Sequence, residues 1–275
     1  MQHTLAFIGG GNMASSLIGG LLARGQDREH VLVADPQVAR LESLKARYGV
    51  RVTQDNAAAL AEAQIVVLAV KPQDLSSAVA GVRSVLERTK PLIISVAAGI
   101  RATDIQRWAG GHPVVRCMPN RAALNGCGIT GLYATPDVTQ PQRELAERVL
   151  GAVGVTLWVE HERDMDIVTA LSGSGPAYFF LLIEMLEDAG VKLGLPPAVS
   201  RRLAVETAFG SGVMAHEAPE SPATLRELVT SKGGTTEAAL KVLEAHGIRD
   251  AFSEAIAAAA RRSAELAEQF GAEPR

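Results

Sequence analysis

The sequence predicts an α/β fold, with an N-terminal domain built on a doubly wound, mainly parallel sheet and an all-α domain after it. Three observations predict this fold. A glycine-rich turn follows the first apolar segment, short β-rich runs alternate with helical patterns up to about residue 160, and no convincing β run follows His161. Because 275 residues are many for a single core, we expect two domains, residues 1–160 and residues 161–275.

The glycine-rich turn directly follows an apolar strand expected at residues 4–8. Its spacing, Gly9-x-Gly11-x-x-Ala14, is a permitted form of the Rossmann dinucleotide-binding fingerprint. Gly9 allows the tight turn, Gly11 lets the backbone approach a pyrophosphate, and Ala14 lets the new helix pack on the strand. Unpaired N–H groups at the start of that helix would face the phosphate oxygens. Three consecutive glycines are also compatible with a merely flexible loop.

The rest of the first domain continues the alternation of strands and helices. The expected strands cover residues 4–8, 31–34, 65–69, 92–96, 114–118 and 155–159, and residues 126–134 are expected to add a strand near the edge of the sheet. The expected helices cover about 12–24, 37–47, 56–63, 73–88, 101–109 and 141–152. The continuous apolar run at 65–70 is typical of a strand buried on both faces.

Asp35 ends the second expected strand. An acid at this place accepts hydrogen bonds from the adenosine ribose and repels a 2′-phosphate, which favours NAD over NADP. Asp35-Pro36 is also an ordinary helix start with the acid as its cap, and the two roles are compatible. Arg40 and Lys45 on the next helix could still reach a phosphate, so the choice of cofactor stays open.

Two further loops are expected at the carboxyl edge of the sheet, where ligands of doubly wound sheets bind. In the segment Ala69–Pro72, Lys71 offers a cation to the phosphates or to a substrate, although a loop lysine is often only solvated. The segment Ser95–Gly99 ends a strand with small residues, as a ribose or nicotinamide lying against the backbone requires.

A third loop at this edge contains a cysteine. Pro119 and Asn120 are expected to shape the wall beside the nicotinamide. Cys117 precedes them without an evident histidine partner, since His112 comes before the strand. We therefore expect a buried, inert thiol at Cys117 rather than a nucleophile.

The chain after His161 has a helical pattern throughout. Helices are expected at about 162–170, 176–193, 197–215, 222–231, 234–246 and 248–269. The mostly apolar run Ala177–Leu186, broken only by Glu184, is typical of a helix that is buried on most sides. So much apolar helical surface also favours dimerisation.

Two motifs in the helical half could carry chemistry. Leu171–Tyr178 places small residues and a proline at the start of a long helix, which suits a helix N-terminus close to a ligand or a domain hinge. Ser231–Thr236 is a second glycine-rich turn that enters a helix. Its free N–H groups and threonine hydroxyls form a pocket suited to a small anion such as a carboxylate, although an inert interhelical loop is the alternative.

The composition excludes several classes of function. There are 27 basic and 30 acidic residues, so the net charge of −3 gives no basis for binding nucleic acid, and only 4% of residues are aromatic. Two cysteines are too few for a disulfide framework or a metal cluster. The start of the chain lacks a signal-peptide pattern, and no run of about 18 apolar residues occurs. We therefore expect a cytoplasmic protein with no metal, membrane or nucleic-acid partner.

Together these motifs resemble those of the pyrroline-5-carboxylate reductase family over essentially the whole chain. The resemblance rests on the segments Gly9–Ala14, Ala69–Pro72, Ser95–Ala98, Arg116–Asn120 and Leu171–Tyr178, and most specifically on Pro222–Leu240. It implies NAD(P)H-dependent reduction of the cyclic imine (S)-1-pyrroline-5-carboxylate to L-proline, the last step of proline biosynthesis. It also implies a homodimer formed by the helical domain, which can assemble further into rings such as a decamer.

The resemblance implies particular site residues as well. The cofactor contacts it implies are Ile8, Gly9, Gly10, Gly11, Asn12, Met13, Asn56, Ala69, Val70, Lys71, Pro72, Ala97 and Ala98. It places the substrate carboxylate on Ser231, Gly233, Gly234, Thr235 and Thr236, supplied by the second subunit of the dimer. Thr169, Ser174, a water or solvent could protonate the imine nitrogen. The family resemblance implies NADPH, whereas Asp35 stands where relatives often carry a small polar residue and argues for NADH.

Two alternatives share parts of this pattern. A β-hydroxyacid dehydrogenase needs a general base, typically a lysine early in the interdomain helix, but Ala177–Leu186 contains no lysine and the next one is Lys192. A dinucleotide-binding sensor without catalysis has no use for the anion-binding turn. Imine reduction asks little of side chains, because the carbon is already electrophilic and good orientation alone removes about 7–11 kcal/mol of barrier.

Overall fold

The structure, a computed structural model, describes residues 3–271, which form two compact units. The first unit comprises the residues up to Ser174 together with those from Ala259 onward, and the second unit comprises Gly175–Ala258. The boundary at 160/161 expected from the sequence therefore differs from this division. The segment that follows the last strand, and the end of the last helix, both belong to the unit that contains the sheet.

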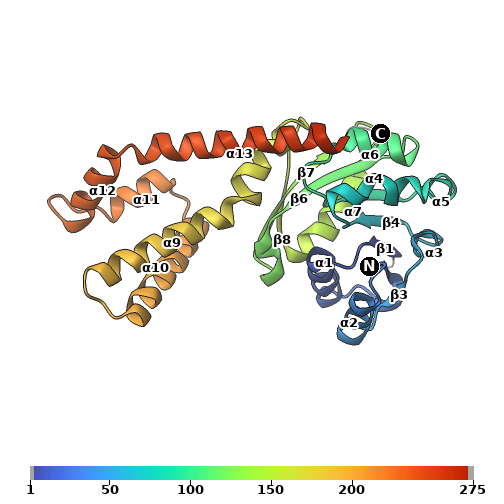
Figure 1. Ribbon diagram of the computed structural model, residues 1–275, viewed down its shortest axis with the longest axis horizontal. Helices are drawn as coiled ribbons and strands as arrows, with labels where there is room; N and C mark the ends of the chain where they lie inside the picture. Colours follow the sequence, from blue (N-terminus) through green and yellow to red (C-terminus); the bar gives the residue numbers. More distant parts are fainter. Residues whose placement is uncertain (1–2, 272–275) are drawn as a thin grey trace. The chain divides into compact units, whose positions relative to one another are not determined.

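The first unit is built around one eight-stranded sheet in the order β3-β2-β1-β4-β5-β6-β7-β8 (Figure 1). The strands are β1 (Leu5–Ile8), β2 (Val31–Ala34), β3 (Arg51–Thr53), β4 (Ile65–Leu68), β5 (Leu92–Ser95), β6 (Val114–Pro119), β7 (Gly128–Ala134) and β8 (Gly154–Trp158). All neighbours pair in parallel except β6 and β7. The predicted doubly wound, mainly parallel sheet is confirmed.

β7 lies between β6 and the edge strand β8, so the strand expected near the edge of the sheet is confirmed. The short 3₁₀ helix Arg121–Asn125 precedes β7, which runs antiparallel to β6. β3 was not expected, because its three residues are exposed or half-buried at the edge of the sheet and give no apolar run.

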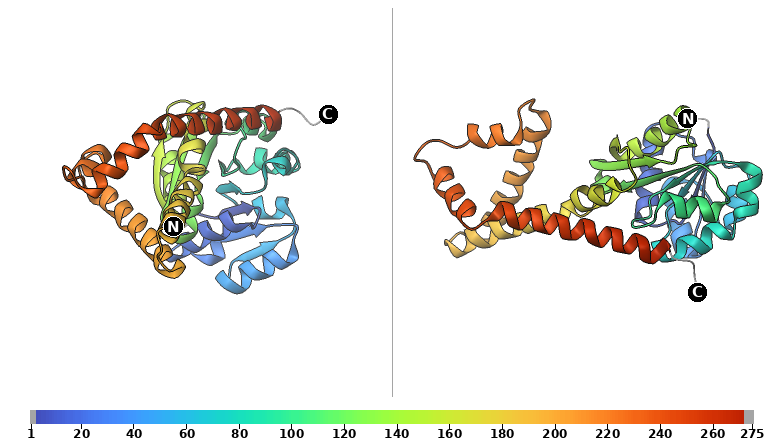
Figure 2. Two further views of the ribbon diagram at one scale, coloured as in Figure 1. Left: turned by 60° about the vertical axis from the view of Figure 1, so that its left-hand side comes forward. Right: turned by 90° about the horizontal axis from the view of Figure 1, so that it is seen from above.

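Helices cover both faces of the sheet (Figure 2). One face carries α1 (Asn12–Ala23), α2 (Val38–Tyr48) and α7 (Gln140–Leu150); the other carries α3 (Asn56–Leu60), α4 (Pro72–Ala80), α5 (Arg83–Thr89) and α6 (Ala102–Ala109). The single helix expected at 73–88 is two helices, because the chain leaves helical geometry at Val82. Continuous strands such as β4 have every residue buried between these two layers.

A buried arginine holds the later helical segments of this unit against the sheet. Arg116 on β6 is 2% exposed, and its guanidinium lies 3.1 Å from Glu162 and 3.8 Å from Asp166 of α8 (Asp164–Val168). Asp166 also accepts a hydrogen bond of 2.7 Å from Ser263 of α13 (Ile248–Gly271). Elements from three distant parts of the sequence therefore share one buried polar cluster.

The second unit is entirely helical. It contains α9 (Gly175–Lys192), α10 (Pro197–Glu217), α11 (Pro222–Leu228), α12 (Thr235–Ala245) and the first part of α13. The α9–α10 pair packs closely at Gly190, where a Cβ would lie 2.1 Å from the Ser200 hydroxyl, and that hydroxyl donates to the Glu187 carbonyl at 2.7 Å.

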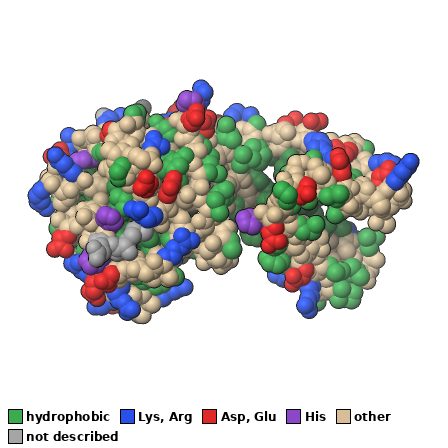
Figure 3. Space-filling model, turned by 180° about the vertical axis from the view of Figure 1, so that it is seen from behind, with side chains coloured by type: hydrophobic (Ala, Val, Ile, Leu, Met, Phe, Trp, Pro, Cys, Tyr) green, Lys and Arg blue, Asp and Glu red, His purple; other side chains and the backbone are tan. Residues whose placement is uncertain are grey.

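The expectation that Ala177–Leu186 is buried on most sides is wrong for the single chain. Phe179 and Phe180 are 66% and 65% exposed, and apolar side chains gather at the surface of this unit (Figure 3). The physical reason is that the helices of this unit leave many of the apolar side chains of α9 exposed in the single chain. By length and composition alone, the helical stretch Asp164–Lys192 could also cross a membrane, but a single such helix is weak evidence for a membrane span.

Candidate active site

A groove of about 940 Å³ opens at the carboxyl edge of the sheet, where β1 is flanked by β2 and β4. This is the point at which the order of the strands reverses, and doubly wound sheets bind ligands there. Of the residues expected to contact a cofactor, the groove is lined by Ile8, Gly9, Gly10, Gly11, Asn12, Asp35, Asn56, Ala69, Val70 and Lys71. Segments from β1, β2, α3 and β4 thus meet at one cavity.

The glycine turn has the geometry that the fingerprint requires. Gly9 has φ +99°, and a Cβ there would lie 2.6 Å from the Ala69 carbonyl oxygen, so only glycine fits. A Cβ at Gly11 would meet nothing within 4 Å, and Gly11 caps α1 without any side-chain hydrogen bond. The start of α1 therefore faces open space with unpaired N–H groups, which fits the pyrophosphate of a dinucleotide.

Asp35 is buried at the end of β2, and both oxygens of its carboxylate accept hydrogen bonds. One carboxylate oxygen accepts the Gly10 N–H at 2.8 Å and lies 3.4 Å from the Arg40 guanidinium. The other accepts the Gln37 N–H at 2.8 Å. The expectation that Asp35 caps the helix and that Pro36 is its first residue is wrong, because α2 begins at Val38 with Gln37 as its N-cap, so Asp35 holds the segment that leads into the helix. Asp35 thus fixes the glycine turn and the start of α2 while it lines the groove.

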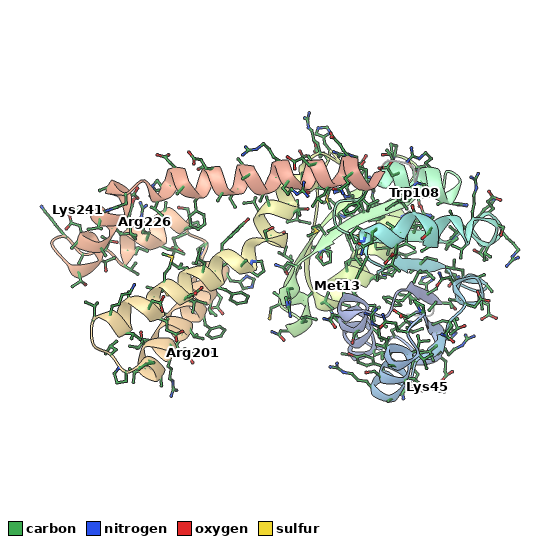
Figure 4. All side chains as sticks on the ribbon, viewed as in Figure 1. Met13, Lys45, Trp108, Arg201, Arg226 and Lys241 are labelled. Carbon is green, nitrogen blue, oxygen red and sulfur yellow. The ribbon has the colours of Figure 1, made fainter. Side chains whose placement is uncertain are left out.

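One face of α2 adds cationic and polar groups that the sequence argument only partly identified. Arg40, Ser43 and Arg47 line the groove at helical spacings of three and four residues. Lys45, also considered from the sequence and labelled in Figure 4, lies on the same helix but does not line it. This spacing was the signal that could have found Ser43 and Arg47.

Six expected cofactor contacts do not line the groove. Met13, near the start of α1, is half-buried and packs on the core (Figure 4). Pro72 is the first residue of α4. Ala97 and Ala98 follow β5, and Pro119 and Asn120 lie where β6 ends. Since β4, β5 and β6 are parallel neighbours, their carboxyl ends share the edge that bears the groove. The Asn120 side chain accepts the Ile129 N–H at 3.2 Å, which anchors this loop to β7.

Cys117 is buried, as expected. Its thiol points to the Val115 carbonyl at 3.7 Å, and burial raises the pKa of the thiol well above its usual range. A thiol that is neither accessible nor ionised cannot act as a nucleophile.

Two hydroxyls considered as proton donors flank a π-helical turn at Thr169–Gly173. The Thr169 hydroxyl donates to the Met165 carbonyl at 2.7 Å, so its hydrogen is already used. The Ser174 N–H donates to the Thr169 carbonyl at 2.9 Å, and the Ser174 hydroxyl has no hydrogen bond within residues 3–271.

The turn at Ser231–Thr236 lies in the second unit between α11 and α12. Gly233 has φ +76°, and its N–H donates to the carboxylate of Glu237. The Gly234 N–H donates to the Ser231 carbonyl at 3.0 Å. The amides of Thr235 and Thr236 stand in the first turn of α12, where no preceding helical carbonyl accepts them.

Two family models match segments of the chain. Residues 4–99 match the family described as NADP oxidoreductase coenzyme F420-dependent, and residues 162–266 match the family described as pyrroline-5-carboxylate reductase dimerisation. The pyrroline-5-carboxylate reductase of Pseudomonas aeruginosa is 46% identical, over 97% of this chain and 98% of its own length.

Two solved structures are similar to the whole chain. A pyrroline-5-carboxylate reductase from Coxiella burnetii has a TM-score of 0.93 at 41% identity, covering 97% of this chain and 99% of that one. The Plasmodium falciparum pyrroline carboxylate reductase with NADP bound has a TM-score of 0.84 at 28% identity, covering 97% and 98%.

Proposed function

The chain belongs to the pyrroline-5-carboxylate reductase family, and from this membership we propose how its residues carry out the reaction. It is an NAD(P)H-dependent oxidoreductase that reduces (S)-1-pyrroline-5-carboxylate to L-proline, the last step of proline biosynthesis. The observation that carries this conclusion is 46% identity over 97% of the chain, joined to an open, glycine-lined groove at the switch point of the sheet.

A nicotinamide dinucleotide supplies the hydride when it is bound. The amides at the start of α1 hold the pyrophosphate, and Lys71 adds a positive charge at the same edge of the sheet. Small residues after β5, Ala97 and Ala98, and the Pro119–Asn120 wall leave room for the nicotinamide beside the backbone. These residues orient the reacting groups and exclude water, and this chemistry needs little else from the protein.

The choice between NADPH and NADH depends on a balance of charges at α2. Asp35 disfavours a 2′-phosphate, but its charge is offset by Arg40 at 3.4 Å. Arg47 lies about two helical turns further along the groove face, with its guanidinium 5.0 Å from the centre of the Tyr48 ring, and adds a second positive charge there. We infer that both reduced cofactors serve, with the Asp35–Arg40 pair setting their ratio.

The substrate carboxylate binds the turn Ser231–Thr236. Because the Gly233 and Gly234 amides are already used within the chain, these glycines shape the turn. The amides of Thr235 and Thr236, with the hydroxyls of Ser231 and the two threonines, then receive the carboxylate. Ser174, rather than Thr169, offers a free hydroxyl to the imine nitrogen, and Thr169 stabilises the π-helical turn that presents it.

The chain forms oligomers, as its match to a dimerisation family requires. We propose a homodimer that covers the exposed apolar face of α9 and α10, with each turn Ser231–Thr236 completing the partner's site. We further propose that the dimers assemble into a ring such as a decamer, and that the protein is cytoplasmic.

Steady-state kinetics with both reduced cofactors and the cyclic imine test this function. Turnover with at least one cofactor is expected, and cofactor binding without turnover would instead support a sensor. Thr236→Ala should raise the KM for the imine more than the KM for the cofactor, because it removes a hydroxyl from the carboxylate pocket. Equal effects on both KM values would refute the assignment of this turn.

A further inference from the structure

Glu237 folds back onto the glycine turn that precedes its own helix. It is the third residue of α12, and one oxygen of its carboxylate accepts the Gly233 N–H. The other oxygen lies 2.9 Å from the Lys241 ammonium, one helical turn later. The Gly233 N–H, and then Lys241, hold the pKa of Glu237 below its usual range, so the side chain is charged at neutral pH.

At Gly233 the shape of the turn depends on hydrogen bonds rather than on packing, although a Cβ at Gly234 would lie 2.4 Å from the Ser231 hydroxyl. Gly233 has φ +76°, and a Cβ there would meet nothing within 4 Å, so no neighbouring atoms confine it. Glycine adopts such a conformation freely and leaves it as freely. Two hydrogen bonds hold the turn: the Gly233 N–H donates to the Glu237 carboxylate, and the Gly234 N–H donates to the Ser231 carbonyl at 3.0 Å.

The position of Glu237 also has an electrostatic cost. A carboxylate ligand on the amides of Thr235 and Thr236 lies within one helical turn of the Glu237 carboxylate, and like charges repel. Lys241 offsets this repulsion, because its ammonium pairs with Glu237 on the side away from Gly233. The pair leaves the start of α12 with its partial positive charge available to an anion.

We propose that Glu237 is a positioning residue that holds the turn Ser231–Thr236 in its carboxylate-binding shape, and that Lys241 neutralises Glu237 so that the substrate carboxylate can approach. This inference rests on the proposed function of the turn. It assigns to Glu237 and Lys241 an effect on the affinity for the imine without any contact with the reacting atoms.

Three variants test the proposal by kinetics on the full-length protein. Glu237→Ala should raise the KM for the imine roughly tenfold, as expected for a lost hydrogen bond to a charged group. The cofactor KM should stay unchanged and kcat should change far less than the imine KM. Glu237→Gln keeps an oxygen acceptor for the Gly233 N–H, so it should recover most of the loss. Lys241→Ala should raise the imine KM about twofold to threefold at low salt, an effect that fades as salt screens the exposed charge.

Glu244→Ala is the matched control, since Glu244 is a salt-bridged glutamate at the far end of the same helix, paired with Arg249 at 2.6 Å. It should leave the imine KM unchanged. An unchanged imine KM in Glu237→Ala would overturn the positioning role, and a lowered one would show that Glu237 competes with the substrate instead. Thr236→Ala separates the two proposals: if it raises the imine KM while Glu237→Ala does not, only the inference about Glu237 fails. If neither variant changes that KM, the turn does not bind the substrate.

Discussion

The carboxylate of Asp35 accepts the backbone N–H of Gly10 at 2.8 Å, which ties the end of β2 to the turn between β1 and α1. Its second oxygen accepts the Gln37 N–H at the start of α2. One buried side chain therefore fixes both loops that border this part of the groove. Of the two roles considered for Asp35 from the sequence, the acid beside the ribose is compatible with its place in the groove, whereas the cap of α2 is Gln37.

Asp35→Ser should move cofactor preference toward NADPH. The substitution removes a negative charge that opposes a 2′-phosphate and frees Arg40 to pair with that phosphate. We expect the ratio of kcat/KM for NADPH to that for NADH to rise roughly tenfold, equivalent to about 1.4 kcal/mol. Both values can fall together because Gly10 loses its partner, so the ratio is the measurement. An unchanged ratio would mean that Asp35 only stabilises the two loops.

Arg40→Ala and Arg47→Ala should each weaken NADPH use more than NADH use. Both side chains line the groove, and a 2′-phosphate is the group that distinguishes the two cofactors. We expect kcat/KM for NADPH to fall roughly fivefold to tenfold, with the larger loss at Arg40, because its removal also leaves Asp35 uncompensated. Lys45→Ala, on the same helix but outside the groove, is the control. Equal losses for all three variants would indicate a general charge effect.

Much of the fold and of the cofactor site could be predicted from local sequence. Buried parallel strands such as Ile65–Leu68 have continuous apolar runs, and the glycine-rich segment marks the tight turn at Gly9, where a Cβ would lie 2.6 Å from the Ala69 carbonyl oxygen. These signals lie within a few neighbouring residues, so the chain displays them without its tertiary structure.

What could not be predicted depends on contacts between distant segments or between chains. The burial of Ala177–Leu186 was inferred from its composition, but composition does not distinguish a face covered by the same chain from one that needs a partner. β3 was missed because its three residues pair at the exposed edge of the sheet and show no apolar run. The occupation of the Gly233 amide by Glu237 is a side-chain choice that no spacing rule specifies.

Arg116→Met should be strongly destabilising although Arg116 lies outside the groove. It leaves the carboxylates of Glu162 and Asp166 largely buried with one cation fewer, and breaking a buried ion pair typically costs about 3–5 kcal/mol. The urea concentration at the midpoint of unfolding should fall in proportion to this loss of unfolding free energy. Adding Glu162→Gln to Arg116→Met should recover part of the loss, because it removes the charge that the arginine compensated. A midpoint close to that of the native protein would show that water or rearrangement satisfies these carboxylates.

Two inactive variants can show whether the turn Ser231–Thr236 acts in the partner's site. Gly11→Glu should abolish cofactor binding without disturbing the fold, because a Cβ at Gly11 meets no atom within 4 Å and the new carboxylate would enter the groove proposed to hold the pyrophosphate. The double variant Thr235→Ala and Thr236→Ala should retain cofactor binding and lose imine binding. Each homodimer alone should have little activity, and fluorescence titration with the reduced cofactor should distinguish the two defects.

Heterodimers of these two variants, isolated through two different affinity tags, should regain about half of the native activity. In one site, the intact groove of the threonine variant meets the intact turn of the Gly11→Glu chain, whereas the other site combines both defects. If each turn instead served the groove of its own chain, every site would carry one defect and the heterodimer would stay as inactive as its parents. The recovered site should also have the native KM for the imine, because its groove and its turn are both unaltered, and this separates true complementation from a small residual rate of either variant.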